Sequence, residues 1–407
     1  MFPHPHPAPS TPVDPGPAPL RILYILRGLV PPPVNARRDA CWYLSHALEG
    51  DVLLPVWWGT EEAVRQKLGP QACPVHTVGR FHYHFLLAGR FQGIRQKVEM
   101  FRFFLRMGRR LHRAHRYHCI VVYGHMLTAL AGVLLKLLTG AKLMVEIVTD
   151  PRRVHIMYAK RGPFTTVASR FMQLFSDLLL HLAVLACDRV MLRYPGQLSC
   201  YPLLRRVPAS VLHGFVPVSE IVPQPEPAEQ YVLLVGYPWY VKGADLLIQA
   251  FRRIAPEFPE VKLKLLGHYP DRTELEALAG GCGQIEFLKA RPGPEALQII
   301  AGALILAVPS RTEGVARVLI EGMSARRAII ASDAGGMPHY VQHGQNGLLF
   351  RSENIAELTD RLRTLLADGE LRQRLADNGF HFARTRLNEN AYAEGFHRAV
   401  ALTVSPP

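Results

Sequence analysis

The chain of 407 residues is long enough for about two domains, and its hydrophobic fraction of 49% excludes a wholly disordered, collagen-like or coiled-coil protein. Its 47 Lys and Arg outnumber 33 Asp and Glu, so the formal net charge of +14 favours anionic partners such as phosphates, nucleic acid or an acidic membrane surface. The six cysteines form no CxxC pair, which argues against a disulfide framework or a zinc knuckle and fits a reducing compartment such as the cytoplasm.

Residues 1–19 hold eight prolines and no apolar core of a signal peptide, which predicts a disordered leader. From residue 20 onward, short apolar runs alternate with helical patterns, which is typical of parallel, doubly wound α/β sheets. Helices are predicted at residues 39–48 and 126–138, and the apolar segments 126–138 and 167–186 are expected to be core helices rather than membrane spans. The strands predicted in this half are residues 21–26, 51–57, 119–123, 142–147, 189–192 and 209–212.

A polar, proline-rich stretch at residues 219–230 is the predicted linker, after which the alternation of strands and helices starts again. The chain is therefore divided into a first domain at residues 20–218, a second at 231–375, and a helical tail at 376–407 that can cross back to the first. Two α/β units of this kind bind ligands in the cleft between them. The strands predicted in the second half are residues 231–235, 262–266, 285–288, 304–308, 327–332 and 347–350.

The strongest chemical feature follows the strand predicted at residues 304–308, where a glycine turn precedes an amphipathic helix. Free backbone N–H groups at such a helix start bind phosphate, at the positive end of the helix dipole. Glu313, before the helix, and Glu321, inside it, can accept hydrogen bonds from sugar hydroxyls. The alternative is that Glu313 only favours the helix start and Glu321 is a solvated helix residue. The N–H groups belong to Gly314, Val315, Ala316 and Arg317.

Two further loops carry weaker signals. The loop after the strand at residues 231–235 runs from Gly236 through Tyr237 to Lys242, whose ammonium can hold a diphosphate or can simply be solvated beside a turn. The paired Gly335 and Gly336 allow the backbone to come close to a ligand, although alone they indicate only a turn.

Together these loops make the second half of the chain resemble the retaining glycosyltransferases of family 4, whose GT-B fold has two Rossmann-like, doubly wound domains that face each other across a cleft. The family's two glutamates, separated by seven residues, are matched by Glu313 and Glu321, and its lysine by Lys242. Its Gly-Gly-x-Pro loop is matched by residues 335–338. Tyr237 stands where the family has a diphosphate-binding arginine. The resemblance covers residues 231–350 and is only topological over residues 20–215.

The resemblance implies that a sugar is moved, with retention, from a nucleotide-diphosphate sugar to a hydroxyl of a glycan or lipid-linked acceptor, without a cofactor or a metal ion. It implies that Glu313 faces the donor sugar and that Glu321 binds the ribose. The diphosphate would be held by Lys242 and by the backbone of residues 314–316.

The first half offers three candidate residues. His125 follows a predicted strand and is a candidate catalytic residue, and Asp150 and Gly28 are candidates on the acceptor side. For His125 and Asp150, the alternative is a structural role as a cap or a loop hydrogen bond. The eighteen histidines of the chain show no convincing metal-ligand pattern.

The stretch from Arg90 to Arg116 carries nine Lys and Arg, one acid and interleaved apolar residues, which predicts a cationic, amphipathic helix. Such a helix can lie on an anionic membrane, as suits cell-surface polysaccharide synthesis at the inner face, or can pack its apolar face on its own sheet. Nucleic-acid binding is disfavoured because no nucleic-acid-binding motif is present. Two alternatives to an active glycosyltransferase are a non-catalytic, membrane-associated nucleotide-sugar-binding protein of the same fold and a dehydrogenase, against which the lack of a GxGxxG motif argues.

Overall fold

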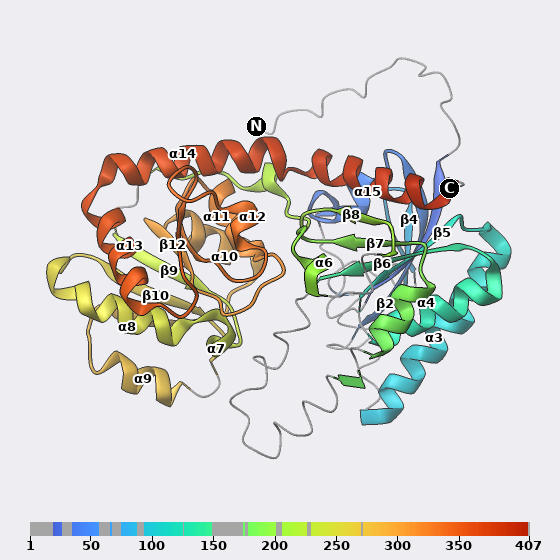
Figure 1. The fold of residues 1–407 in the computed structure, drawn as a ribbon, viewed down its shortest axis with the longest axis horizontal. Coiled ribbons are helices and arrows are strands. Elements are labelled where there is room, and N and C mark those ends of the chain that lie inside the picture. Colours follow the sequence, from blue (N-terminus) through green and yellow to red (C-terminus); the bar gives the residue numbers. More distant parts are fainter. Residues whose placement is uncertain are drawn as a thin grey trace.

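The computed structural model describes residues 19–26, 35–56, 66, 75–87, 93–124, 126–148, 174–175, 178–200, 206–225, 229–269 and 272–405. It contains two β-sheets, each with helices on its faces, which lie next to each other (Figure 1). This confirms the predicted fold class of two Rossmann-like α/β units. Three of the candidate site residues, Gly28, His125 and Asp150, lie outside the described residues.

The N-terminal sheet has eight strands in the order β3-β4-β2-β1-β5-β6-β7-β8. All neighbours are parallel except β3 and β4, which form an antiparallel hairpin at one edge. The central strands are continuous apolar runs because parallel strands are covered on both faces. The strands are β1 (Leu20–Ile25), β2 (Leu48–Val56), β3 (Val75–Val78), β4 (Phe81–Leu87), β5 (Cys119–Tyr123), β6 (Lys142–Ile147), β7 (Arg189–Leu192) and β8 (Ala209–Val211).

One face of this sheet is covered by α3 (Gly93–His115) and α4 (Met126–Thr139), which pack along each other. Phe104 of α3 is fully buried there, so most of the apolar side of α3 packs on its own sheet. Ile94 and Val98, near the start of α3, remain exposed. The opposite face is covered by η1 (Ala36–Arg38), α1 (Ala40–Leu44) and α15 (Glu389–Val404).

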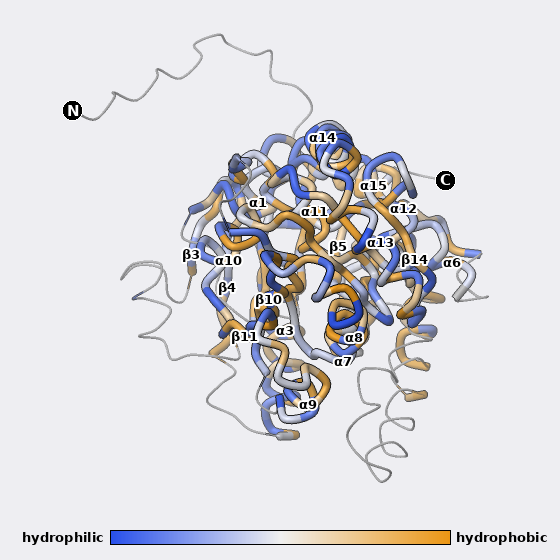
Figure 2. Tube along the Cα trace, turned by 90° about the vertical axis from the view of Figure 1, so that its left-hand side faces the viewer, coloured by the Kyte–Doolittle hydropathy of each residue, from blue (hydrophilic) through white to orange (hydrophobic). Residues whose placement is uncertain are grey.

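The C-terminal sheet has six parallel strands in the order β11-β10-β9-β12-β13-β14. Its strands are β9 (Tyr231–Val235), β10 (Lys262–Gly267), β11 (Ile285–Lys289), β12 (Ile305–Val308), β13 (Ala328–Ser332) and β14 (Leu348–Phe350). In Figure 2 the hydrophobic segments gather in the centre of the molecule, around α11 and β5. The helical segments from residue 197 onward are α6 (Gln197–Cys200), η5 (Val218–Glu220), α7 (Trp239–Lys242), α8 (Ala244–Ile254), η6 (Ala255–Glu257), α9 (Thr273–Ala279), α10 (Gly293–Ala301), α11 (Arg317–Ser324), α12 (Met337–Tyr340), α13 (Ile355–Ala367) and α14 (Gly369–Arg386).

The last three helices begin at side-chain caps, which explains where the chain turns. Asn354 accepts a hydrogen bond from the N–H of Glu357 at 3.1 Å, and Asp368 accepts one from Leu371 at 2.8 Å. Asn388 caps α15 in the same way. A side chain of this kind satisfies an N–H group that has no partner inside the helix.

The chain passes between the two sheets twice, once between β8 and β9 and once between α14 and α15. α14 lies against α11 and β13. The two crossings are tied together, because Glu389 accepts hydrogen bonds from the N–H and hydroxyl of Ser219 at 2.8 and 2.6 Å. Arg384 also donates to the carbonyl of Ile221 at 2.9 Å.

One local prediction was wrong in its bounds. The helix expected at residues 39–48 is shorter, because β2 already begins at Leu48. The described end of the apolar segment expected to be a core helix, residues 178–186, is helical and buries Ala183 and Val184, whereas Leu178, Leu182 and Leu185 are exposed. No described helix combines the length and the apolarity that a membrane crossing requires.

Candidate functional site

Three loops of the C-terminal sheet meet where its strands end. They follow β9, β12 and β13, which are neighbours in the sheet, so the loops after them must lie next to one another. Lys242 ends α7 in the first loop, Glu313 lies in the second, and Gly335 and Gly336 lie in the third. Carboxyl ends of parallel strands are where α/β sheets bind their ligands.

The ammonium of Lys242 and the carboxylate of Glu313 form an ion pair, although the residues are 71 positions apart in the sequence. Their side chains are 21% and 12% exposed, so the pair is mostly shielded but still partly accessible to solvent. Ser310 Oγ lies 3.4 Å from the same carboxylate oxygen of Glu313. The structure therefore joins two of the residues that the sequence singled out separately.

Glycine lets the first loop approach the second. Gly243 has a φ of 71°, and a Cβ there would overlap the carbonyl oxygen of Pro309. Gly236 has a φ of 138°, and a Cβ there would lie 2.9 Å from Cε of Lys242. Both positions thus favour glycine for the conformation, and Gly243 also requires it for the space.

The paired glycines of the third loop lie against the backbone of the second. Gly335 has a φ of 59°, and a Cβ on it would overlap the carbonyl oxygen of Glu313. The N–H of Gly336 donates to that same oxygen at 3.2 Å, and a Cβ on Gly336 would overlap the carbonyl of Gly314. These contacts fix the backbone at Glu313 and Gly314, so the glycines act here by positioning the second loop.

Arg311 makes several contacts that hold two loops of the site together, and the sequence did not reveal this role. Its guanidinium makes two hydrogen bonds to the Asp245 carboxylate at 2.8 and 2.7 Å and one to the Tyr240 carbonyl at 2.6 Å. It also lies 3.9 Å from the centre of the Tyr240 ring and pairs with Glu353. Since Tyr240 and Asp245 flank Lys242 in the sequence, Arg311 holds the Lys242 loop against the Glu313 loop.

The N-terminus of α11 carries the remaining donor-site candidates. Ala316 is its N-cap residue and makes no side-chain hydrogen bond to the first N–H groups of the helix. Val315 is half-buried and Arg317 is exposed. Glu321 lies one turn after Arg317, where burial raises the pKa of its carboxyl and the charge of Arg317 opposes that effect.

A cavity of about 440 Å³ lies beside these loops, at the ends of β10 and β11. Tyr269 and Phe287 meet edge to face in its lining at 6.3 Å, and the buried hydroxyl of Tyr269 has no hydrogen-bond partner among the described residues. Tyr237 packs edge to face on His268 at 5.7 Å, which joins the cavity to the Lys242 loop. In the sequence, the only indication of this cavity is that its residues lie at the ends of two predicted strands or directly after them. The cavity is lined by Gly267, His268, Tyr269, Arg272, Phe287, Leu288, Lys289 and Ala290.

The N-terminal domain contacts the glycine loop through the residues that follow β7. The Tyr340 hydroxyl donates to the carbonyl of Arg193 at 2.6 Å, and a Cβ on Gly336 would lie 2.7 Å from the ring of Tyr194. Arg193 is itself held by a buried ion pair with Glu146. The two domains are therefore in contact next to the candidate site.

No cluster of three or more His, Cys, Asp or Glu side chains able to hold a metal ion occurs among the described residues. The charged groups described at these loops are the Lys242 ammonium, the α11 N-terminus with Arg317, and the carboxylates of Glu313 and Glu321. Such a set suits an anion next to hydroxyl groups.

Residues 220–382 match the protein family described as glycosyl transferases group 1. The chain is 32% identical over 154 residues to an uncharacterized glycosyltransferase of Methanocaldococcus jannaschii, which covers 37% of this chain and 42% of the relative. It is 30% identical over 151 residues to the sulfoquinovosyl transferase SQD2 of Arabidopsis thaliana, covering 36% and 29% of the two chains. The chain thus spans less than half the length of these curated relatives.

Solved structures match over nearly the whole chain. Sucrose-phosphate synthase of Thermosynechococcus elongatus superimposes with a TM-score of 0.73 at 17% identity, covering 94% of this chain and 98% of that one. The Anabaena protein HepE in complex with UDP gives a TM-score of 0.65 at 16% identity, covering 94% and 100%. At these identities the similarity establishes the fold, which is GT-B. Residues 220–382, which match the glycosyl transferases group 1 family, lie within this fold.

Proposed function

We propose that this protein is a retaining, metal-independent glycosyltransferase that moves a sugar from a nucleotide-diphosphate sugar to a hydroxyl of a glycan or lipid-linked acceptor. The observation that carries the proposal is the Lys242–Glu313 pair beside the uncapped N-terminus of α11. An ammonium and free N–H groups attract a diphosphate, and the adjacent carboxylate accepts hydrogen bonds from the sugar that the diphosphate carries.

The cavity beside the loops accommodates the rest of the donor. It is large enough for a nucleoside base, and its aromatic wall of Tyr269 and Phe287 offers a surface for stacking. Relatives and structural neighbours include transferases and a protein bound to UDP, and this fits a nucleotide-sugar donor. Glu321, whose raised pKa reflects a poorly solvated position, is the proposed partner of the ribose hydroxyls.

In the proposed reaction, the bond between the anomeric carbon and the diphosphate breaks and a bond from the acceptor oxygen to that carbon forms on the same face. The acceptor proton passes to an oxygen of the leaving diphosphate. Lys242 and the helix N-terminus stabilise the negative charge that develops there. The rigid second loop keeps these groups in place without reorganisation during the reaction.

A transfer assay with UDP-, GDP-, ADP- and dTDP-sugars tests the proposal. Lys242→Ala and Glu313→Ala should each lower turnover by about 100-fold, while the fold survives. Lys262→Ala, which removes two exposed ion pairs of the same sheet, with Glu229 and Glu286, is the control and should keep full activity. Wild-type rates in either site variant would contradict the assignment.

The second candidate function is a non-catalytic nucleotide-sugar-binding protein of the same fold. Tyr237 favours it, because this exposed ring packs on His268 where the family has a charged side chain. Donor-induced thermal stabilisation without hydrolysis or transfer would select this alternative.

The proposed setting is the cytoplasm, with a lipid-linked acceptor at the inner face of the membrane. The exposed arginines of α3 support this setting, since anionic lipids attract cationic helices.

A further inference from the structure

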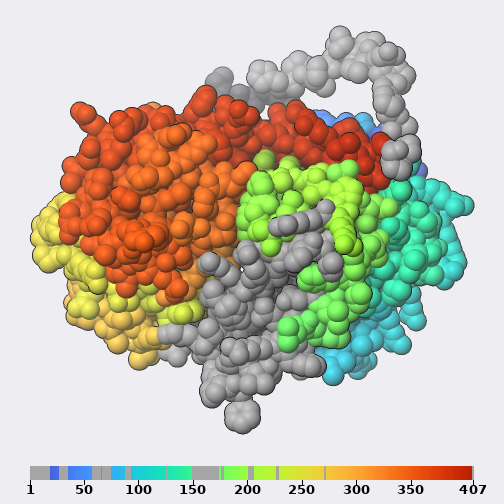
Figure 3. Space-filling model, viewed as in Figure 1, coloured from blue at the N-terminus to red at the C-terminus, as the bar shows by residue number. Residues whose placement is uncertain are grey.

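The third loop of the candidate site is packed against the N-terminal domain at Gly336. A Cβ on this residue would lie 2.1 Å from the carbonyl oxygen of Gly314 and 2.7 Å from the ring of Tyr194. Gly314 comes two residues before the N-cap of α11, so Gly336 contacts the backbone that leads to this helix and the other domain at the same time. Figure 3 shows where the orange surface of the C-terminal domain meets the green surface of the N-terminal domain.

A hydrogen bond beside this packing joins the two domains directly. The Tyr340 hydroxyl donates to the carbonyl of Arg193 at 2.6 Å, and Tyr340 is only 3% exposed. Within its own domain, Tyr340 is fixed through its carbonyl, which accepts a hydrogen bond from Asn346 Nδ2 at 3.1 Å. A buried hydroxyl without an acceptor costs free energy, so the bond to Arg193 favours one arrangement of the loop. The third loop is therefore held from both domains.

Arg193 is itself anchored by buried polar groups of the N-terminal domain. Its guanidinium pairs with the carboxylate of Glu146, which is fully buried. The same guanidinium donates to the carbonyls of Leu212 and His213 at 3.3 and 3.1 Å. The N–H of Arg193 donates to the side-chain oxygen of Gln197 at 2.5 Å. Because its side chain and its N–H are both fixed, Arg193 presents its carbonyl to the other domain in a defined position.

We propose that Arg193 and Glu146 are positioning residues for the donor site, which they support from the opposite domain. The proposal rests on the proposed function for its ligand, a nucleotide-diphosphate sugar. The support passes through Tyr340 and Gly336 to the backbone of Glu313, whose carbonyl accepts the N–H of Gly336. Without it, the loop populates other arrangements, and the apparent affinity for the donor falls with the fraction of molecules in the binding-competent one. Glu146 thus acts on donor binding from inside the N-terminal core.

Tyr340→Phe tests the hydrogen bond between the domains. Its control is Tyr231→Phe, because the buried Tyr231 donates to the carbonyl of Ile299 at 2.6 Å within the C-terminal domain alone. In the full chain without ligand, hydrogen–deuterium exchange at residues 334–340 and 313–317 should be about fivefold faster in Tyr340→Phe and unchanged in the control. Affinity for whichever of UDP-, GDP-, ADP- or dTDP-glucose stabilises the wild type should fall by a similar factor, again only in Tyr340→Phe.

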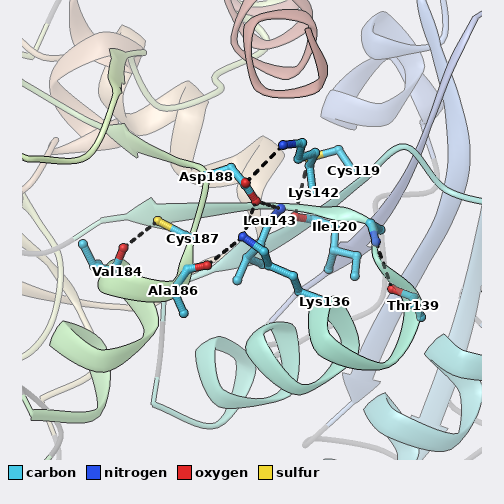
Figure 4. Close-up of polar contacts among 11 residues, drawn as sticks. Cys119, Ile120, Lys136, Thr139, Lys142, Leu143, Val184, Ala186, Cys187 and Asp188 are labelled. Atoms are coloured by element: carbon cyan, nitrogen blue, oxygen red, sulfur yellow. Dashed lines mark hydrogen bonds and ion pairs between the residues drawn. The ribbon is translucent and has the colours of Figure 1, made fainter. Parts of the chain in front are cut away.

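Glu146→Gln tests the buried pair, since it keeps the size of the side chain and removes its charge. Its control is Lys136→Met, because Lys136 Nζ donates at 2.7 Å to Asp188, which directly precedes β7, whereas Arg193 directly follows that strand (Figure 4). Both variants should lower the melting temperature, because each breaks an ion pair that is shielded from water. Only Glu146→Gln should also accelerate exchange in the third loop and weaken binding of the sugar nucleotide, by about tenfold.

The outcomes separate this proposal from the proposed function. Equal exchange in Tyr340→Phe and Tyr231→Phe would overturn the positioning role, as would faster exchange of the third loop without a loss of sugar-nucleotide affinity. If Glu146→Gln lowers only the melting temperature, as Lys136→Met does, the pair stabilises its own domain and the proposal is wrong. Should Glu146→Gln fail to fold, Tyr340→Phe decides alone. If no sugar nucleotide stabilises the wild type, the proposed function fails, and the exchange rates still decide whether the N-terminal domain positions the loop.

Discussion

Replacing Arg311 by alanine should damage the C-terminal domain more than any surface charge change. The Arg311 side chain is 6% exposed and that of its partner Asp245 is 12% exposed. Removing one member of a buried ion pair leaves the other charge without compensation and costs about 3–5 kcal/mol. For a unit of this size, such a loss lowers the melting temperature by roughly 10 °C.

The assay is chemical and thermal denaturation of a double-mutant cycle. Arg311→Ala and Asp245→Ala should each lower the free energy of unfolding strongly, and the double variant should lose clearly less than their sum because no unpaired buried charge remains. Arg363→Ala is the matched control, since Arg363 and Glu257 form a pair whose side chains are 42% and 43% exposed, and such an exposed pair contributes little to stability.

The same substitution should also weaken donor binding, because Arg311 holds the loops of Lys242 and Glu313 together. Nucleotide-sugar stabilisation, measured as the ligand-induced rise in melting temperature, should fall in Arg311→Ala at a temperature where the variant is still folded. The reasoning fails if Arg311→Ala costs no more than Arg363→Ala, or if the cycle shows purely additive effects.

Three further predictions concern a loop, a pH dependence and thiol reactivity. Gly335→Ala should cost about 1–3 kcal/mol and abolish nucleotide-sugar stabilisation, because its φ of 59° and the nearby Glu313 carbonyl exclude a side chain; retained stabilisation would refute this role. Burial lowers the pKa of His213 from 6.5 to about 4, so the contribution of this residue to stability is complete above pH 6.5 and is lost between pH 6.5 and 4. Denaturation curves of the wild type should therefore show that the free energy of unfolding falls by about 2 kcal/mol when the pH is lowered from 7.5 to 5, and His213→Asn should lack this decrease. Parallel pH profiles of the two proteins would contradict this prediction. Burial raises the pKa of the Cys187 thiol to about 12, so alkylation at pH 8 mapped by mass spectrometry should modify Cys282 well before Cys187, and equal rates would contradict the packing.

The sequence predicted the two-sheet fold because continuous apolar runs separated by helical patterns leave few alternatives to parallel strands. It missed the hairpin of β3 and β4, whose polar residues His76, His82 and His84 hide the strand pattern. It did not show that the helix at residues 178–186 has an exposed apolar side, since the sequence of an apolar helix is similar in a core and on a surface.

At the candidate site, the sequence indicated Lys242 and Glu313 because each lies in a glycine-containing loop after a predicted strand. The two strands are neighbours in the sheet, which explains why the two side chains meet. It could not indicate Arg311, because the partners of this side chain come from a different loop and only the fold brings them together. The roles of Glu321, Tyr237 and the backbone at residues 314–317 remain predictions that the donor assay addresses.

The double passage of the chain between the sheets has a practical consequence for dissecting this molecule. Phe396 of α15 is fully buried in the N-terminal core, so a fragment that stops at the interdomain segment would lack part of its own interior. An autonomous N-terminal half would need the last sixteen-residue helix supplied as a separate peptide or fused through a new connection. Conversely, deleting that helix should unfold the half of the molecule that lies farthest away from it in the sequence.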